Sequence, residues 1–251
     1  MGSLRIIQIT DFHLTADPAG VLRNVNTNDS LRRVLAYISA KEPECALLLA
    51  TGDLANDGSP QAYKRIANYL SQAPIPTCCL PGNHDDAKLM AGALAKLGIN
   101  TLQTVNLGGW LVIPLDSTVE DQEGGCLASD ALSSLEETLT GASEHHCLIA
   151  LHHQPVITGG SIDATGLANG EALLELLAGY PNAKAAVFGH VHRDFTTRHG
   201  TLRLFGGPAT CFQFEAGTPH VSIDQRPPGY RWFELDEDGG VRSGAVFLSD
   251  L

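Results

Sequence analysis

The sequence has little positive charge and no long apolar run. Its 251 residues include 16 Lys and Arg against 28 Asp and Glu, which gives a formal net charge of −12. No basic run is longer than Arg32-Arg33. Nucleic-acid phosphates and anionic membranes both attract clustered Lys and Arg, and a membrane span needs a longer apolar stretch, so we expect neither partner. A small anionic substrate is compatible with the acidic chain, because bound divalent cations reverse the local field.

The sequence also lacks a CxxC pair, a regular cysteine spacing and a signal-peptide pattern. Residues 1–11 show no order of charged, long apolar and small residues, and they fit a first β-strand instead. Of the six cysteines, Cys45 and Cys147 lie in apolar runs, where a free thiol behaves as a small hydrophobe. The neighbours Cys78 and Cys79 are compatible with a redox pair or with two buried strand residues. We expect reduced thiols and a cytoplasmic location.

The apolar residues follow two patterns along the chain, one typical of buried strands and one typical of amphipathic helices. With 43% apolar and 18% charged residues, the sequence is typical of a core-forming globular protein. Short apolar runs alternate with amphipathic stretches, and the chain after residue 194 contains only strand-like runs. This pattern indicates α/β layers with a second sheet packed on the first. Because no linker, repeat or low-complexity segment interrupts it, we expect residues 1–251 to form a single domain.

The same patterns predict the bounds of the elements. Ser59-Pro60 opens one helix with a capping hydroxyl followed by a proline at the first helical position. The predicted helices are Ser30–Lys41, Pro60–Ser71, Asp85–Leu97, Ser129–Thr140 and Gly170–Ala178. The predicted strands are Leu4–Thr10, Cys45–Thr51, Pro76–Leu80, Leu102–Val105, Trp110–Leu115, Cys147–Leu151, Ala185–Phe188, Asp194–Arg198, Leu202–Phe205, Thr210–Phe214, Tyr230–Leu235 and Val241–Phe247.

Five short polar motifs each follow a strand-like run. Any one of them is more often structural, since Asp caps helices, Gly-Asp forms turns and a lone His is usually a satisfied polar residue. Together they are hard to explain in this way, because the carboxyl ends of neighbouring strands converge on one crevice. Their carboxylate, imidazole and amide groups suit Mn, Fe, Co or Zn, and the absence of Cys argues against a structural zinc site. The motifs are Asp11-Phe12-His13, Gly52-Asp53, Gly82-Asn83-His84-Asp85, His152-His153 and Gly189-His190-Val191-His192.

In this order, from Ile9 to Phe214, the motifs resemble the calcineurin-like metallophosphoesterase superfamily. A narrower resemblance, to bacterial class III 3′,5′-cyclic-AMP phosphodiesterases, extends through other segments in the same order. The resemblance implies a four-layer αββα sandwich with two central mixed β-sheets and a site for two divalent metal ions, Fe, Mn, Co or Zn. The segments of the narrower match are His13-Leu14 through Asn24-Val25-Asn26-Thr27, Gly52-Asp53-Leu54 with Asp57-Gly58-Ser59, Leu151-His152-His153 with Pro155, Cys211-Phe212-Gln213-Phe214 and Pro228-Gly229-Tyr230-Arg231.

The resemblance also implies which residues bind the ions. His152, the first of its pair, aligns with the family's ligand. Asn56 stands where one variant of the family has a tyrosinate ligand, so we expect no tyrosinate-to-iron charge-transfer band. By this carry-over, the first metal takes Asp11, His13 and His192, the second takes Asn83, His152 and His190, and Asp53 bridges both.

The implied activity is hydrolysis of a 3′,5′-cyclic nucleotide, foremost cyclic AMP to AMP, by attack of a hydroxide held between the metals. His84 follows Asn83 as the family's general acid does, and we expect both to contact the substrate. Asp85 either orients the ring of His84 or caps the helix that follows it. We predict that His153 either supports the metal ligands from behind or faces the substrate, the alternative being a packing residue beside the ligand, and Arg193 is expected to point to solvent.

The predicted ligands do not identify the substrate. Another phosphoester hydrolase, acting on a glycerophosphodiester, a nucleotide pyrophosphate or a phosphoprotein, would use the same residues. A metal-free interaction scaffold would predict lost ligands, and every expected ligand is present. The metal, the physiological phosphodiester and the oligomeric state stay open. The β-rich tail fits a homo-oligomer edge or the completion of the second sheet, and a lid formed by residues 214–231 is a further open point.

Overall fold

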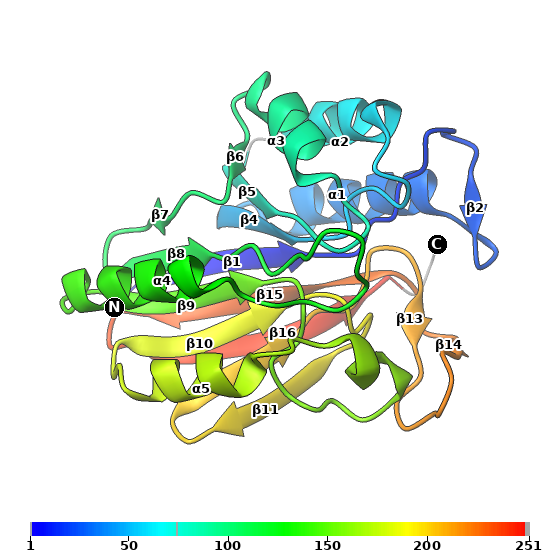
Figure 1. Cartoon of the computed structure of the whole chain (residues 1–251). Coiled ribbons are helices and arrows are strands. Elements are labelled where there is room, and N and C mark those ends of the chain that lie inside the picture. Colours follow the sequence, from blue (N-terminus) through cyan, green and yellow to red (C-terminus); the bar gives the residue numbers. More distant parts are fainter. Residues whose placement is uncertain (1, 74, 249–251) are drawn as a thin grey trace.

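The computed structural model describes residues 2–73 and 75–248, and its main strands form two six-stranded sheets (Figure 1). In both sheets the central strands are parallel and at least one edge is antiparallel. The first sheet has the order β16 (Val241–Phe247), β15 (Gly229–Asp236), β1 (Ser3–Ile9), β4 (Cys45–Thr51), β5 (Thr77–Leu80), β6 (Asn100–Thr101). The second has the order β11 (Phe195–His199), β12 (Leu202–Gly206), β10 (Ala183–Phe188), β9 (His146–Leu151), β8 (Trp110–Pro114), β7 (Val105–Asn106).

Helices cover the outer face of each sheet. The first sheet packs against α1 (Thr27–Lys41), α2 (Pro60–Gln72) and α3 (Ala87–Ala95), which lie together at the top of Figure 1. The second packs against α4 (Ser129–Gly141) and α5 (Gly170–Ala178). Shorter elements are the hairpin of β2 (Val21–Leu22) and β3 (Val25–Asn26), the 3₁₀ helix η1 (Ser161–Thr165), and the pair β13 (Gln213–Phe214) and β14 (Ile223–Asp224). None of the described helices is long and apolar enough to cross a membrane.

Strand alternation produces the stacking of the layers. Ile7 and Ile9 of β1 face the helices, while Ile6 faces the second sheet, because successive strand residues point to opposite faces. Gln8, fully buried on the same face as Ile6, donates from Nε2 to Thr51 Oγ1 in its own sheet and to the Phe188 carbonyl oxygen in the other, at 2.9 Å each. Burial on both faces explains why these strands read as continuous apolar runs. The predicted four-layer αββα fold is confirmed.

Several predicted bounds differ from the structure, and the helix predicted from Ser30 already begins at Thr27, with Asn26 as its cap. Leu102–Val105 is not one strand: Leu102 has a φ of 57°, and the chain crosses here from β6 of the first sheet to β7 of the second. Of Thr210–Phe214, only β13 is a strand. The helix predicted from Asp85 begins at Ala87, because the Asp86 side chain caps it and accepts from two backbone N–H groups.

Candidate metal centre

Seven side chains meet at one edge of the two sheets, and we call them the cage. They follow β1, β4, β5, β9 and β10, and all but Asn83 are at least 94% buried. The described residues therefore include side chains able to hold metal ions. The cage residues are Asp11, His13, Asp53, Asn83, His152, His190 and His192. Four groups have ligand atoms within 4.8 Å of one another: Asp11–His13–His192, Asp11–Asp53–His152, His13–Asp53–His84 and His152–His153–His190.

Unusual backbone conformations mark the same place. Asp11, His13, Asp53, His190 and His192 have φ angles of 54°, 49°, 51°, 65° and 45°. A non-glycine residue held in this left-handed region costs roughly 1–3 kcal/mol, and such residues gather at functional sites. Backbone hydrogen bonds hold two of them, since Asp11 N donates to the Gly52 carbonyl at 3.0 Å and His13 N to the Asp53 carbonyl at 2.9 Å. The sharp turns direct these side chains toward one another.

Glycines at two strand exits let the backbone pass close to the cage residues and to a neighbouring strand. A Cβ on Gly82 would overlap the Asp53 carboxylate and lie 2.8 Å from His152 Nε2. A Cβ on Gly189 would lie 2.6 Å from the Thr51 carbonyl oxygen. Real Cβ atoms do not approach other atoms so closely, so the cage requires glycine at both positions.

Backbone carbonyls orient two of the cage histidines. His152 Nδ1 lies 2.8 Å from the Thr51 carbonyl oxygen, and His192 Nδ1 lies 2.8 Å from that of Phe212. A carbonyl only accepts, so each Nδ1 donates and each Nε2 points to the cage. His13 Nε2 lies 3.1 Å from His192 Nε2, and its Nδ1 has no hydrogen-bond partner among the described residues. Two ring nitrogens aimed at one point fit a shared cation.

The Asp53 carboxylate lies between the two halves of the cage. Its Oδ2 is 3.5 Å from His13 Nε2 and 3.4 Å from His152 Nε2. Its Oδ1 accepts from the backbone N–H of His84 at 3.0 Å. On the side of the second predicted metal, Asn83 Oδ1 lies 3.2 Å from His152 Nε2. One carboxylate oxygen therefore faces a predicted ligand of each metal, which is the geometry of a bridging ligand.

The cage attracts positive charge. Burial acts to raise the pKa of Asp53, but the charge and hydrogen bond of His152 outweigh it and hold that pKa well below its usual range. Burial likewise opposes a charge on His152, and Asp53 overrides it and raises the pKa of His152 to about 9. The pKa of His192 is raised well above its usual value by Asp11, again against burial. Protons on the histidines partly neutralise the negative charge of the carboxylates here, and divalent cations would neutralise it more fully.

The structure corrects the prediction for Asp85. Its carboxylate does not contact the ring of His84 and does not cap α3 in the described structure. It accepts instead from the backbone N–H groups of Leu54 (3.0 Å), Ala55 (2.9 Å) and Gly82 (3.0 Å) and from the Tyr63 hydroxyl (3.0 Å). Asp85 therefore ties the turn after β4 to the turn after β5. Asp85 does not orient the ring of His84, because the Nδ1 atom of that ring lies against the Asn56 carbonyl oxygen instead.

The ring of His84 faces the pocket. Its Nδ1 lies 3.1 Å from the Asn56 carbonyl oxygen, so Nδ1 donates and Nε2 is free. The ring is exposed, and its centroid lies 4.9 Å from that of His13. His84 is thus placed beside the cage with one nitrogen open to a ligand.

His153 does not face the substrate side, contrary to the prediction. The side chain is fully buried, its Nδ1 lies 2.8 Å from Ser117 Oγ and its Nε2 lies 3.1 Å from the Glu123 carbonyl oxygen. Both nitrogens are thus occupied by the loop that follows β8. Burial and the neighbouring His152 lower the pKa of His153 to about 3, so it is neutral.

Arg193 does not point to solvent either, because its side chain is 5% exposed. Its guanidinium donates to the carbonyl oxygen of Thr158 and lies 5.5 Å from the ring of Phe195. The positive φ of His192 turns the chain back at this point, so that residues 158–163 cover the arginine.

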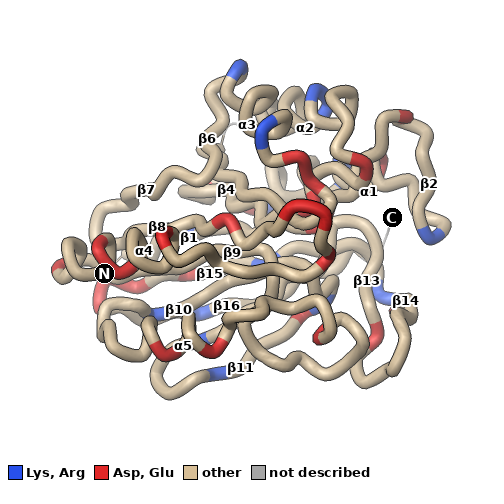
Figure 2. The backbone as a smooth tube through the Cα atoms, in the orientation of Figure 1, with Lys and Arg blue, Asp and Glu red and all other residues tan. Residues whose placement is uncertain are grey.

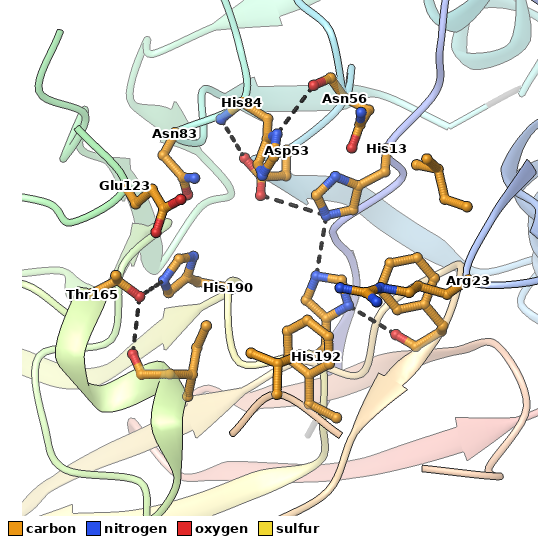
Figure 3. A pocket seen from close by; sticks show the side chains of 15 residues that line it. His13, Arg23, Asp53, Asn56, Asn83, His84, Glu123, Thr165, His190 and His192 are labelled. Carbon is orange, nitrogen blue, oxygen red and sulfur yellow. Dashed lines mark hydrogen bonds and ion pairs between the residues drawn. The ribbon is translucent and has the colours of Figure 1, made fainter. Parts of the chain in front are cut away.

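A pocket of about 390 Å³ opens over the cage (Figure 3). His13, Asp53, His190 and His192 surround its floor, and Asn83 and His84 line one side. Three further lining residues belong to none of the five polar motifs, because they do not lie at the exits of the central strands. Arg23 extends into the pocket from the β2–β3 hairpin, Glu123 stands on the loop after β8, and Thr165 ends η1.

An acidic groove of about 710 Å³ adjoins this pocket and shares Asn83, His84 and Glu123 with it. Its lining includes six carboxylate residues and one Lys or Arg, Lys88; part of this acidic lining forms the central red stretch of Figure 2. Negative charge at this mouth opposes polyanionic chains and leaves room for a small ligand. The predicted substrate contact Asn83 thus borders both cavities. The six carboxylate residues are Asp57, Asp85, Asp86, Glu120, Asp121 and Glu123.

Comparison with characterised proteins agrees with this geometry. The chain is 36% identical over 251 residues to a 3′,5′-cyclic adenosine monophosphate phosphodiesterase of Pseudomonas aeruginosa, covering 99% of this chain and 92% of that protein. It is 37% identical over 249 residues to the protein of the same name from Escherichia coli, covering 98% and 90%. A 3′,5′-cyclic-nucleotide phosphodiesterase of Nostoc is 35% identical, covering 94% and 89%.

Solved structures share the fold at low sequence identity. A dimetal phosphatase from Danio rerio superposes with a TM-score of 0.69 at 14% identity, covering 99% of this chain and all of the other. The purple acid phosphatase from yellow lupin also reaches 0.69, at 12% identity, covering 98% of this chain and 54% of the other. The family model for calcineurin-like phosphoesterases matches residues 4–194. The chain therefore belongs to the calcineurin-like phosphoesterase family.

Proposed function

We propose that this chain is a two-metal phosphodiesterase that hydrolyses 3′,5′-cyclic nucleotides, with cyclic AMP as the foremost substrate. The observation that carries the proposal is the cage, with Asp53 Oδ2 between ligands of its two halves. Relatives that are 35–36% identical over 94–99% of this chain bear cyclic-nucleotide phosphodiesterase names, which supports this substrate class. In this proposal Asp11, His13 and His192 hold one divalent ion, Asn83, His152 and His190 hold the other, and Asp53 bridges.

The donor set fits such ions. Imidazole, carboxylate and amide ligands suit Mn, Fe, Co or Zn. The pKa values of Asp11 and Asp53 lie below their usual range, so both carboxylates are charged at neutral pH. When bound, two divalent ions activate water and offset charge on phosphoryl oxygens. The chain itself supplies the placement of the ligands, the burial that strengthens their charges and the proton for the leaving group.

We assign that proton to His84. Hydrolysis of the cyclic ester expels a ribose alkoxide, which is a poor leaving group until it is protonated. In its protonated form His84 donates from Nδ1 to the Asn56 carbonyl, and its Nε2–H points into the pocket beside Asn83. A positioned proton donor of this kind typically contributes about 10²–10⁴ in rate.

The side of the pocket opposite His84 suits a nucleoside. Leu22, Phe212, Phe214 and Val221 supply apolar surface, and Arg23 is the one Lys or Arg that lines this cavity within the described chain. A small cavity with apolar walls and a few convergent polar groups is the usual form of a small-molecule site. The acidic groove next to it would repel the phosphates of a nucleic acid.

The test is a substrate panel with the metal-loaded chain. We expect kcat/KM for cyclic AMP to exceed the values for 2′,3′-cyclic AMP, ATP and bis(p-nitrophenyl) phosphate, with cyclic GMP as the matched base control. A preference for ATP or for a glycerophosphodiester would transfer the assignment to another phosphoester on the same ligands. Metal analysis belongs to the same experiment, because a chain that binds no metal and turns over none of the panel would be a scaffold.

Two further proposals concern the setting of the enzyme. All six cysteines are free thiols, and five are buried, which supports a reducing, cytoplasmic location. A homo-oligomer, which the sequence left open, is the second proposal, with the free edge of β16 as the candidate surface. Cell fractionation and sedimentation measurements test the two independently.

A further inference from the structure

The Thr165 hydroxyl has two contacts, and together they determine its hydrogen-bond direction. Thr165 Oγ1 lies 3.1 Å from the carbonyl oxygen of Ile162 and 2.9 Å from Nε2 of His190. A hydroxyl has one hydrogen, and a carbonyl only accepts. Thr165 therefore donates to Ile162 and accepts from His190, which means that the ring proton of His190 sits on Nε2.

The consequence is that Nδ1 of His190 is the nitrogen left free for a metal. In Figure 3 this second nitrogen points away from Thr165, toward the side of the pocket where Asn83 and Asp53 lie. The histidines His152 and His192 have the opposite arrangement, with Nδ1 held by a main-chain carbonyl. His190 is thus a cage ligand whose free nitrogen is selected by a side chain, and a side chain can be changed by mutation.

Hydrogen bonds fix the segment that leads to Thr165. The Asp163 carboxylate accepts from the backbone N–H groups of Thr158 and Gly159 at 2.8 and 2.7 Å. Gln154, just after β9, donates to the Ile162 carbonyl at 2.9 Å, and buried Arg193, just after β10, holds the Thr158 carbonyl. The threonine hydroxyl is therefore presented to His190 by two strand exits that also carry cage residues.

We propose that Thr165 is a positioning residue for the second metal: its hydroxyl keeps His190 in the tautomer that ligates through Nδ1. The inference rests on the proposed function only in taking His190 as a metal ligand. Partners behind a metal-binding histidine typically contribute about 10–100-fold to metal affinity. Removing the hydroxyl should therefore weaken one of the two bound ions and leave the other unchanged.

The experiment compares Thr165→Ser with Thr165→Ala in the full chain. Both variants lose the methyl group, so the difference between them isolates the hydroxyl, and the Ile162 carbonyl keeps its Gln154 donor in both. We expect the serine variant to bind two Mn²⁺ ions with nearly unchanged affinities, and the alanine variant to bind the second ion about tenfold or more weakly. Thr196→Ala, at an exposed strand position, is the matched control.

A second readout follows the tautomer directly. With Zn²⁺ bound, ¹⁵N NMR of the His190 ring should show the proton on Nε2 in the wild type and the serine variant. Equal affinities for the second ion in the alanine and serine variants, or a His190 proton on Nδ1 in the wild type, would overturn the proposal. A chain that binds both ions as expected yet leaves cyclic AMP intact would reject the proposed substrate alone.

Discussion

At the residue scale, the site depends on which nitrogen of each imidazole is already occupied. His152 and His192 donate from Nδ1 to main-chain carbonyls, His190 contacts a threonine through Nε2, and His84 donates from Nδ1 to the Asn56 carbonyl. Each remaining nitrogen faces the cage or the pocket. The chain thus prepares its ligands and its proton donor before any ion or substrate arrives.

The role of His84 predicts a dependence on the leaving group. His84→Ala should lower kcat for cyclic AMP about 100-fold or more, because the ribose alkoxide needs a proton. The loss on bis(p-nitrophenyl) phosphate should stay below about tenfold, since nitrophenolate leaves without one. Asp53 keeps its contact with the backbone of residue 84 in the variant, so both metals should be retained in elemental analysis. Equal losses on the two substrates would reject the assignment.

The contacts of Asp85 predict a structural effect that spreads to the metals. In Asp85→Asn, one carboxylate oxygen is replaced by an NH₂ group, which cannot accept a hydrogen bond. At least one of the backbone N–H groups that donate to Asp85 would lose its acceptor, so the free energy of unfolding should fall by about 2–4 kcal/mol. The Asp53 turn should loosen and metal affinity should fall with it. Asp86→Asn is the control, because Asn caps a helix as well as Asp. Urea unfolding with and without a chelator measures both the stability and the effect of bound metal. If Asp85→Asn and Asp86→Asn unfold alike under both conditions, Asp85 does not hold the two turns together.

The raised pKa values of His152, to about 9, and of His192 predict proton release on metal binding. A raised value means that the metal-free site holds these protons at pH 7, and a metal must displace them. Apparent metal affinity should therefore rise with pH through neutrality, and the part of this rise that comes from His152 should level off above about pH 9. Calorimetric titration with Mn²⁺ in buffers of different ionisation enthalpy should show release of about two protons at pH 7. No release at that pH would contradict the assignment.

At the scale of elements, the site is made by strand exits that come closer than ordinary side chains allow. Gly82→Ala would place a methyl group against the Asp53 carboxylate, and such overpacking costs about 1–3 kcal/mol. We expect lower metal occupancy and a loss of about 100-fold or more in activity, since each 1.36 kcal/mol of barrier is tenfold in rate.

Gly92→Ala is the matched control for this prediction. Gly92 lies in α3, and its added Cβ would meet nothing within 4 Å. Alanine there should raise stability by about 0.5–1 kcal/mol and leave activity unchanged. Thermal unfolding, metal content and turnover of both variants make the comparison. Full activity in Gly82→Ala would show that the turns after β4 and β5 can move apart without loss of function, which would contradict the prediction.

At the scale of the whole molecule, we propose that residues 1–251 form one domain, because the two sheets share a core and direct hydrogen bonds. Gln8 joins them near the cage, and Trp110 of β8 donates from Nε1 to the Asp236 carbonyl of β15 at 3.0 Å. Residues from β1, β4, β5 and β15 pack against residues from β8, β9, β10 and β12 in that core. Separating the sheets would expose all of this surface.

The two tryptophans allow a direct test of the single domain. Trp232 lies in the first sheet and Trp110 in the second, so Trp110→Phe and Trp232→Phe leave one reporter for each. In each variant, urea unfolding followed by fluorescence should coincide with that followed by far-UV circular dichroism. Two separate midpoints within one variant would indicate sheets that unfold independently.

The sequence by itself indicated α/β layers with two packed sheets and placed five polar motifs at strand exits, while the four-layer order and the seven predicted ligands came from the family resemblance. The motifs are local signals, because a polar motif after an apolar run marks a strand exit wherever the strand later packs. Parallel neighbours then bring such exits to one edge. The bounds of short strands were less predictable, as Leu102–Val105 shows, since a crossover between sheets has no period of its own.

Only the tertiary structure decided which partner each polar group has. His152 contacts the carbonyl of Thr51, His192 that of Phe212, and Asp85 the backbone of another strand exit. Such carbonyl and N–H groups are the same at every residue, so no side-chain pattern indicates which of them will be near. The predictions for Asp85, for His153 as a substrate contact and for Arg193 were wrong for this reason. That the seven cage residues would lie together could be expected from their residue types at strand ends, and their roles as metal ligands stay a proposal.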